Sequence, residues 1–303
     1  MSLNADLRLP GSIVAPLTPF TEDLSVDYDA LKGIIDYSVE TCGAAMIIAA
    51  GVEAQEYQYL DYAARKELVD KTIEFVDGRR PVVVGVSHPS FRTAVELAHH
   101  AADKGAQAVQ LLAPNRPTGG PPKMSELVRY YQSVLAETDL PMMLYLNAGP
   151  GTDLSVPATV ELAQLPGIDF VKESSRDLAR VSRLIAEIET AGHARYFTTM
   201  QMYLPTLLLG GSGVTLPPPA ALLIRKITEA LQRGDVDEAA RIQRQVAVWP
   251  ARWMPFGLAA VMKASLNHLG VKAGLPYPPY EPLTGEALTA LQAYLDTTDL
   301  TAP

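Results

Sequence analysis

Short apolar runs alternate with segments of helical periodicity eight times between residue 11 and about residue 231. The apolar runs lie at 13–15, 45–50, 81–86, 108–112, 141–146, 168–172, 195–198 and 213–216. A strand covered by helices on both faces of a parallel sheet reads as a continuous apolar run. Eight such units with short connections predict an α/β fold, a closed (β/α)8 TIM barrel. An open dinucleotide-binding sheet is disfavoured, because no GxGxxG turn follows the first run.

The pattern changes after Gly234, where only helical periodicity continues. Three helices are expected over 235–248, 256–269 and 286–296, with prolines separating the first two. We therefore expect a barrel over residues 1–232 and a C-terminal three-helix region, a helical appendage, over 233–303. Two local expectations concern the barrel: Thr93 and Glu96 form a capping box at a helix start, and the prolines at 217–219 lie in a loop.

Composition limits the partners of this chain. Its 303 residues are 48% hydrophobic and 19% charged, which supports a large core and argues against disorder. A net charge of −9 gives no basic surface for nucleic acid. No apolar run approaches the length of a membrane span, and the N-terminus lacks the residue order of a signal peptide. The single cysteine, Cys42, excludes an intrachain disulfide and fits a reducing compartment, so we expect a cytoplasmic protein with a buried Cys42.

Polar residues gather at the carboxyl ends of the predicted strands, where barrels of this kind carry their active sites. They include Glu53, Gln55, Glu56, Ser87, His88, Asn115, Arg116, Tyr145, Asn147, Lys172, Glu173, Thr198, Thr199 and Thr215. The five histidines show no metal-ligand spacing, and no Walker or G-x-S-x-G motif is present. No metal is therefore expected.

Lys172 is the strongest catalytic candidate, because it ends the otherwise apolar run that starts at residue 168. Partial burial disfavours the ammonium form, and a neutral amine can attack a carbonyl to form an imine. Tyr145 ends the adjacent strand, so its hydroxyl is placed to relay a proton. Position alone also allows a Lys172 that reaches water or pairs with Glu173, and a Tyr145 that only packs in the barrel.

Five segments carry a wider resemblance: GSIVAPLTPF at 11–20, YLN at 145–147, FVKESS at 170–175, GGSGV at 210–214 and VMKA at 261–264. In this order they resemble the dihydrodipicolinate synthase / N-acetylneuraminate lyase family of class I aldolases and lyases. The resemblance implies Lys172 as the imine former, Tyr145 as its proton relay, and a pyruvate-type 2-keto acid as substrate. It implies no metal or organic cofactor, and a homo-oligomer, either a tetramer or a dimer. Substrate binding is expected at Glu53, Ala54, Asn147, Gly213 and Thr215.

The turn after the second strand departs from the family. Members usually carry Gly-Thr-Thr-Gly-Glu or Gly-Ser-Thr-Gly-Glu there, and the hydroxyls hold the keto acid's carboxylate. This chain has VEAQE at 52–56, so Glu53 and Ala54 replace the hydroxyl residues. An ionised Glu53 would repel a substrate carboxylate about 4 Å away by roughly 1–4 kcal/mol. Glu53 therefore points away, is protonated, or faces a neutral or cationic substrate group.

Two further departures argue against a lysine-biosynthesis synthase in the strict sense. The tyrosine pair after the fourth strand is replaced by PNRP at 114–117, and the synthase arginine after Tyr145 is absent from 147–151. Three hypotheses remain open. The first is a Schiff-base lyase or aldolase for a 2-keto acid or sugar-acid-like substrate. The second is a Schiff-base dehydratase of a keto-deoxy sugar acid, in which Glu53 or His88 assists loss of water. The third is a non-catalytic barrel that binds a small ligand.

Overall fold

Eight parallel strands close into a barrel in the order in which they occur in the chain. The structure is a computed structural model that describes residues 11–147 and 151–301. The N-terminal residues that we compared with a signal peptide, and residues 148–150 of the segment without the synthase arginine, lie outside this range. The strands are β1 (Gly11–Val14), β2 (Met46–Ala49), β3 (Val82–Gly85), β4 (Ala108–Leu112), β5 (Met142–Leu146), β6 (Ile168–Glu173), β7 (Arg195–Thr198) and β8 (Gly213–Leu216). Each overlaps a predicted apolar run, so the predicted fold class is confirmed.

Helices follow the strands, and three more helices follow the last barrel helix. The barrel helices are α1 (Tyr28–Asp36), α2 (Tyr62–Val76), α3 (Phe91–Asp103), α4 (Met124–Leu135), α5 (Val156–Ala163), α6 (Leu178–Leu184), α7 (Tyr203–Leu208) and α8 (Pro218–Gln232). The C-terminal helices are α9 (Val236–Val248), α10 (Leu258–His268) and α11 (Gly285–Leu295), and a short 3-10 helix (Ala251–Phe256) joins the first two. They lie close to the predicted ranges. The domain division at residue 232 stays a prediction.

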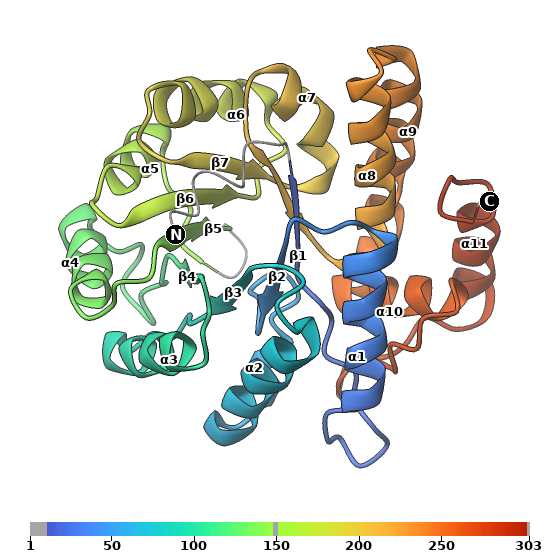
Figure 1. Ribbon diagram of the computed structural model, residues 1–303, viewed down its shortest axis with the longest axis horizontal. Helices are drawn as coiled ribbons and strands as arrows, with labels where there is room; N and C mark the ends of the chain where they lie inside the picture. Colours follow the sequence, from blue (N-terminus) through green and yellow to red (C-terminus); the bar gives the residue numbers. More distant parts are fainter. Residues whose placement is uncertain (1–10, 148–150, 302–303) are drawn as a thin grey trace. The chain divides into compact units, whose positions relative to one another are not determined.

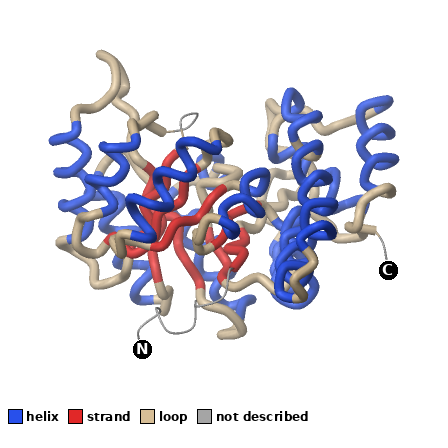
Figure 2. The backbone as a smooth tube through the Cα atoms, turned by 90° about the horizontal axis from the view of Figure 1, so that it is seen from above, coloured by secondary structure: helices blue, strands red, loops and turns tan. Residues whose placement is uncertain are grey.

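Internal contacts group the chain into two compact units that differ from this division. Within the described residues, one unit joins Gly11 to residues 81–147 and 151–215, and the other joins residues 12–80 to residues 216–301. In the first unit, helices α3 to α6 lie along the outer side of strands β3 to β7 (Figure 1). Figure 2 shows the strands of the chain in red and the helices in blue. Apart from Asp169 on β6, every residue of β3 to β6 is buried, as a sheet covered by helices requires.

The second unit contains the C-terminal helices. Helices α8 and α9 pack along each other, and α10 contacts both α8 and α11 (Figure 1). Trp249, just after α9, is 1% exposed, and its indole N–H donates to Ser265 Oγ on α10 at 3.2 Å. The Tyr294 hydroxyl on α11 donates to the Gln245 carbonyl on α9 at 3.1 Å. These two contacts satisfy polar groups that would otherwise be costly to bury.

Two local predictions are wrong, and one is confirmed. Pro218 and Pro219 form the first turn of α8 rather than a loop, because the first helical positions need no backbone N–H donor. Thr93 does not cap α3, which starts earlier, with Ser90 as its N-cap residue. Cys42 is fully buried, as expected of a small core residue.

Candidate active site

Tyr145 and Lys172 lie side by side in the first unit. The strand register aligns Leu112 with Tyr145, Tyr145 with Lys172, Lys172 with Phe197, and Phe197 with Gly213. Residues in register on neighbouring strands point to the same face of a sheet. Tyr145 and Lys172 are each 2% exposed. The predicted adjacency is therefore present, and the catalytic roles of the two residues stay predictions.

The Lys172 amine lies in a short chain of polar groups. Its Nζ donates to Ser174 Oγ at 3.3 Å and to the Glu173 carbonyl at 3.4 Å, and it lies 5.6 Å from the centre of the Tyr145 ring. Ser174 Oγ donates to the Tyr145 hydroxyl at 3.5 Å, and Asn147 Nδ2 donates to the same hydroxyl at 3.3 Å. These bonds are at the long end of the usual range, and they keep the amine, the hydroxyl and the phenol close together.

Ser174 is a site residue that we did not single out from the sequence. It follows Lys172 by two positions, and residues two apart along an extended segment face the same side. That spacing was the available signal. The structure places its hydroxyl between the amine and the phenol, where a proton can pass between the two.

The Glu173 carboxylate is held by a separate network. Its Oε1 pairs with Arg180 Nε at 3.0 Å, and its Oε2 accepts from the Ser175 backbone N–H at 2.9 Å and from the Tyr196 hydroxyl at 3.3 Å. Burial, and then the charge of Glu173, raise the pKa of Tyr196 well above its usual value, so this phenol stays a neutral donor. The network fixes the segment that carries Ser174.

Gly213 and Thr215, two predicted substrate-binding residues, lie on β8. A Cβ at Gly213 would lie 2.1 Å from the carbonyl oxygen of Gly11, so close backbone packing requires glycine there. Thr215 is 2% exposed and lies on the same strand face as Gly213. A role for either residue in binding substrate stays a prediction.

Glu53 and Ala54 belong to the second unit, in the turn after β2. Both are half-buried, and the Oε2 atom of Glu53 is buried. Gln55 follows in the left-handed conformation with φ 55°, and a 3-10 helix (Glu56–Tyr59) begins immediately after it. The substrate-binding roles predicted for Glu53 and Ala54 also remain predictions.

Glu56 anchors this turn through a buried ion pair that we did not predict. Its Oε1 lies 2.6 Å from Lys263 Nζ of α10, and the two side chains are 2% and 1% exposed. Glu56 Oε2 accepts from the Thr18 N–H at 2.8 Å. Lys263 Nζ donates to the carbonyls of Thr18 at 2.7 Å and Leu275 at 3.0 Å. One lysine thus joins the segment after β1, the turn after β2 and the C-terminal segment.

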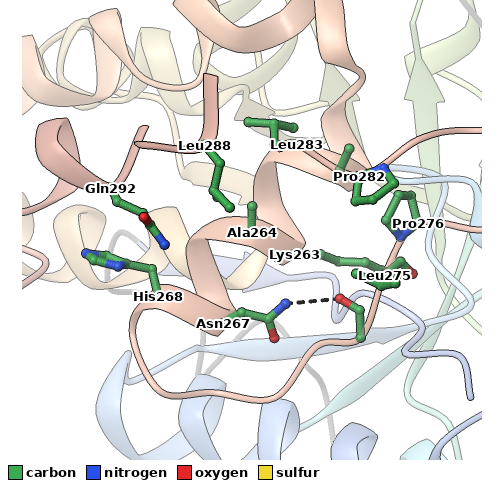
Figure 3. Close-up of a pocket in the computed structure, with 12 residues that line it drawn as sticks. Lys263, Ala264, Asn267, His268, Leu275, Pro276, Pro282, Leu283, Leu288 and Gln292 are labelled. Atoms are coloured by element: carbon green, nitrogen blue, oxygen red, sulfur yellow. Dashed lines mark hydrogen bonds between the residues drawn. The ribbon is translucent and has the colours of Figure 1, made fainter. Parts of the chain in front are cut away.

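Lys263 also borders a cavity of about 200 Å³ in the second unit. Its walls come from α10, α11 and the segment around residues 274–283, and most are apolar (Figure 3). Asn267 Nδ2 donates to the Gly274 carbonyl at 3.0 Å along one side. His268 Nε2 lies 2.7 Å from Asp296 Oδ1, within hydrogen-bond distance.

His88 is exposed, and its Nδ1 accepts from the Ser90 N–H at 3.0 Å. Within residues 11–147 and 151–301, no group of three or more His, Cys, Asp and Glu side chains could hold a metal ion. In the same part of the chain, no helix is long and apolar enough to cross a membrane.

Comparison with known proteins decides the family. The model of the dihydrodipicolinate synthetase family matches residues 8–298. The chain belongs to this family. A 4-hydroxy-tetrahydrodipicolinate synthase of Ralstonia nicotianae is 30% identical over 95% of this chain and 97% of its own length. Among solved structures, YagE, a prophage protein of E. coli K12, has 23% identity and a TM-score of 0.85, and it covers 95% of this chain and 97% of its own. The N-acetylneuraminate lyase of Mycoplasma synoviae has 20% identity and a TM-score of 0.82, and it covers 97% and 98%.

As a member of the dihydrodipicolinate synthetase family, the chain is an enzyme of the class I aldolase and lyase type. Family members work through a lysine Schiff base and need no metal or organic cofactor, in agreement with the expectation from the sequence. The departure from the family at Glu53 and Ala54, which the resemblance led us to expect, stays a prediction.

Proposed function

We propose that this enzyme is a Schiff-base lyase or aldolase that acts on a 2-keto acid, with Lys172 forming the imine. The observation that carries the proposal is the position of the buried Lys172 amine, 3.3 Å from a Ser174 hydroxyl that itself lies 3.5 Å from the Tyr145 phenol. Burial disfavours the charged amine, and the neutral amine is the nucleophile. A phenol connected through a hydroxyl can supply and remove the protons.

The proposed reaction begins when the neutral Lys172 nitrogen attacks the keto carbon and one of the nitrogen's protons passes to the carbonyl oxygen. A second proton, relayed from Tyr145 through Ser174, lets that oxygen leave as water and produces the protonated imine. In cleavage, the hydroxyl on the fourth carbon gives its proton to the Tyr145 phenolate, the bond between the third and fourth carbons breaks, and the electron pair of that bond moves toward the imine nitrogen. The fragment beyond that bond leaves as an aldehyde. The remaining enamine takes a proton on carbon, and water releases the keto acid. Condensation is the reverse.

Pyruvate is the first 2-keto acid to test. The family resemblance implies a pyruvate-type substrate, and YagE was solved in complex with pyruvate. At 23% identity YagE shares the fold, so its ligand guides the choice of compound only. We also keep the predictions that the enzyme is cytoplasmic and forms a homotetramer or homodimer.

Borohydride trapping tests the proposal directly. Protein incubated with pyruvate and borohydride should gain one reduced adduct, and peptide mapping should place it on Lys172. Lys263 is the matched control within the protein, because it is also a buried lysine but carries an ion pair with Glu56. The variant Lys172→Met should gain no adduct. Folded wild-type protein that gives no adduct across a panel of 2-keto acids would contradict the proposal.

Glu53 supports a second candidate, a Schiff-base dehydratase of a keto-deoxy sugar acid. The Oε2 atom of Glu53 is buried, the resemblance leads us to expect hydroxyl residues at this turn, and a carboxylate can act as a general acid or base in the loss of water. Product analysis separates the two reactions, since dehydration gives one product and cleavage gives two fragments. Membership of an enzyme family argues against the third hypothesis, a non-catalytic barrel.

A further inference from the structure

A polar pocket of about 470 Å³ lies in the first unit, beside the carboxyl ends of β5 and β6. Binding sites for small molecules usually measure about 300–1,000 Å³. Five of the residues that line it matter for its chemistry: Asn147, Asp153, Ser174, Arg176 and Arg180. The pocket belongs to the same unit as Lys172 and shares residues with the site around it.

Two of the lining residues connect the pocket to the reacting groups. Ser174 Oγ lies 3.3 Å from Lys172 Nζ, and Asn147 Nδ2 lies 3.3 Å from the Tyr145 hydroxyl. Part of a substrate that extends beyond an imine at Lys172 can therefore enter the pocket past these two side chains. The proposed cleavage needs such a space, because its substrate is longer than the keto acid that it releases.

The charged groups of the pocket are not equivalent. Arg180 is neutralised by Glu173 at 3.0 Å. Asp177, another lining residue, caps α6 by accepting from the Ala179 N–H at 2.9 Å and the Arg180 N–H at 3.4 Å. Arg176 is exposed and makes no hydrogen bond or ion pair within the described part of the chain. Its guanidinium is thus available to a ligand.

Asp153 is another charged residue that lines the pocket, and it is also exposed. Its carboxylate would repel an anion beside it, whereas it can accept hydrogen bonds from substrate hydroxyls. The anionic part of a ligand therefore belongs next to Arg176, whose planar guanidinium suits a carboxylate.

We propose that this pocket binds the far end of the substrate and that Arg176 binds an anionic group there. The substrate class is then a 2-keto acid with a second anionic group at the opposite end of its chain. This inference rests on the proposed function, because the pocket is placed relative to an imine at Lys172.

Length-matched keto acids test the inference. The amount of borohydride-trapped adduct, measured against the concentration of the keto acid, gives an apparent dissociation constant for each compound. The dianion 2-oxoglutarate is compared with the monoanion 2-oxopentanoate, and the dianion 2-oxoadipate with the monoanion 2-oxohexanoate. Wild-type protein should prefer at least one dianion over its monoanion. Arg176→Gln should weaken that dianion about tenfold, the effect of losing one charge-assisted hydrogen bond, and leave the monoanion unchanged. Arg176→Lys should restore part of the preference.

Arg183→Gln is the matched control, because Arg183 lies on α6, which begins just after Arg176, but it pairs with Glu187 at 2.8 Å and is 57% exposed. It should leave all four constants unchanged. Asp153→Asn should leave the dianion bound as tightly as before or more tightly. The inference is overturned if the wild-type protein does not prefer a dianion, or if Arg176→Gln weakens the dianion and its length-matched monoanion equally. In either case a pyruvate adduct on Lys172 would still support the proposed function. If no keto acid is trapped, both are overturned.

Discussion

Replacing Lys263 by methionine should destabilise the protein in a way that depends on pH. The substitution keeps most of the volume of the side chain and removes its charge. It leaves the Glu56 carboxylate, 2% exposed, without the ammonium that lies 2.6 Å away in the wild type. It also removes the donor from the carbonyls of Thr18 and Leu275.

The expected loss can be worked out from these contacts. Removing one member of a buried pair costs about 3–5 kcal/mol, because the other charge is left uncompensated. Each unmatched carbonyl adds about 1–3 kcal/mol if no water reaches it. Glu56 can reduce the cost by binding a proton. We therefore expect a loss of about 4 kcal/mol at pH 7.5, with the larger part due to the carboxylate.

The sign of the pH dependence follows from the pKa of Glu56, which burial raises even in the wild type despite the opposing effect of Lys263. Without Lys263 the pKa must rise further. A carboxyl whose pKa is raised in the folded state stabilises the protein fully below its unfolded pKa, and this contribution is lost as the pH rises through the folded pKa. Between the unfolded-state and folded-state pKa of Glu56, the free energy of unfolding falls by up to about 1.4 kcal/mol per pH unit.

Urea unfolding at pH 5.5 and pH 7.5 measures the effect. The destabilisation by Lys263→Met should be about 2 kcal/mol larger at the higher pH, within the limit set by one proton. Lys272→Met is the matched control, because Lys272 pairs with Asp27 at 2.7 Å but is 73% exposed, and it should change the midpoint little at either pH. Equal losses at both pH values would refute the reasoning, since they would mean that Glu56 stays charged or was never buried.

Three further predictions address single residues. Tyr145→Phe should keep the fold and lower kcat about 100-fold, as steady-state kinetics would show, because the proton relay is lost; unchanged kcat would exclude that role. Gly213→Ala should lower the free energy of unfolding by about 1–3 kcal/mol, because the new Cβ would lie 2.1 Å from the Gly11 carbonyl oxygen. Gly33→Ala should raise the free energy of unfolding by about 0.5–1 kcal/mol, because its Cβ would have no atom within 4 Å. Cys42 should not react with a thiol reagent in native protein at pH 8, since burial raises its pKa to about 12, and should react fully in urea; fast native labelling would contradict this.

The eight-stranded barrel could be predicted because its signal is repeated. Each strand must bury both faces, so each leaves an apolar run in the sequence, and a helical segment follows each run. Barrels of this kind carry their active sites at the carboxyl ends of the strands, which predicts Lys172 and Tyr145 at the same end of adjacent strands. The register of β5 and β6 pairs these two residues directly.

The errors and omissions have different physical causes. A run of prolines is compatible with a loop and also with the first turn of a helix, and the structure shows that Pro218 and Pro219 lie in such a first turn. Ser174 is one of two adjacent serines in the sequence, and the structure shows that its hydroxyl lies between the amine and the phenol. The Glu56–Lys263 pair joins positions far apart in the chain, and such a pairing leaves no local pattern.

The pair between Glu56 and Lys263 has a consequence for how this enzyme can diverge. A recombination event that replaced the C-terminal helices would also replace residue 263, while residue 56 would stay with the recipient chain. A hybrid without a cation at position 263 would have a buried Glu56 carboxylate with no ion-pair partner, next to the turn that carries Glu53. The helical tail and that turn are therefore constrained to be inherited together, and a shuffled library should retain the two positions as a matched set.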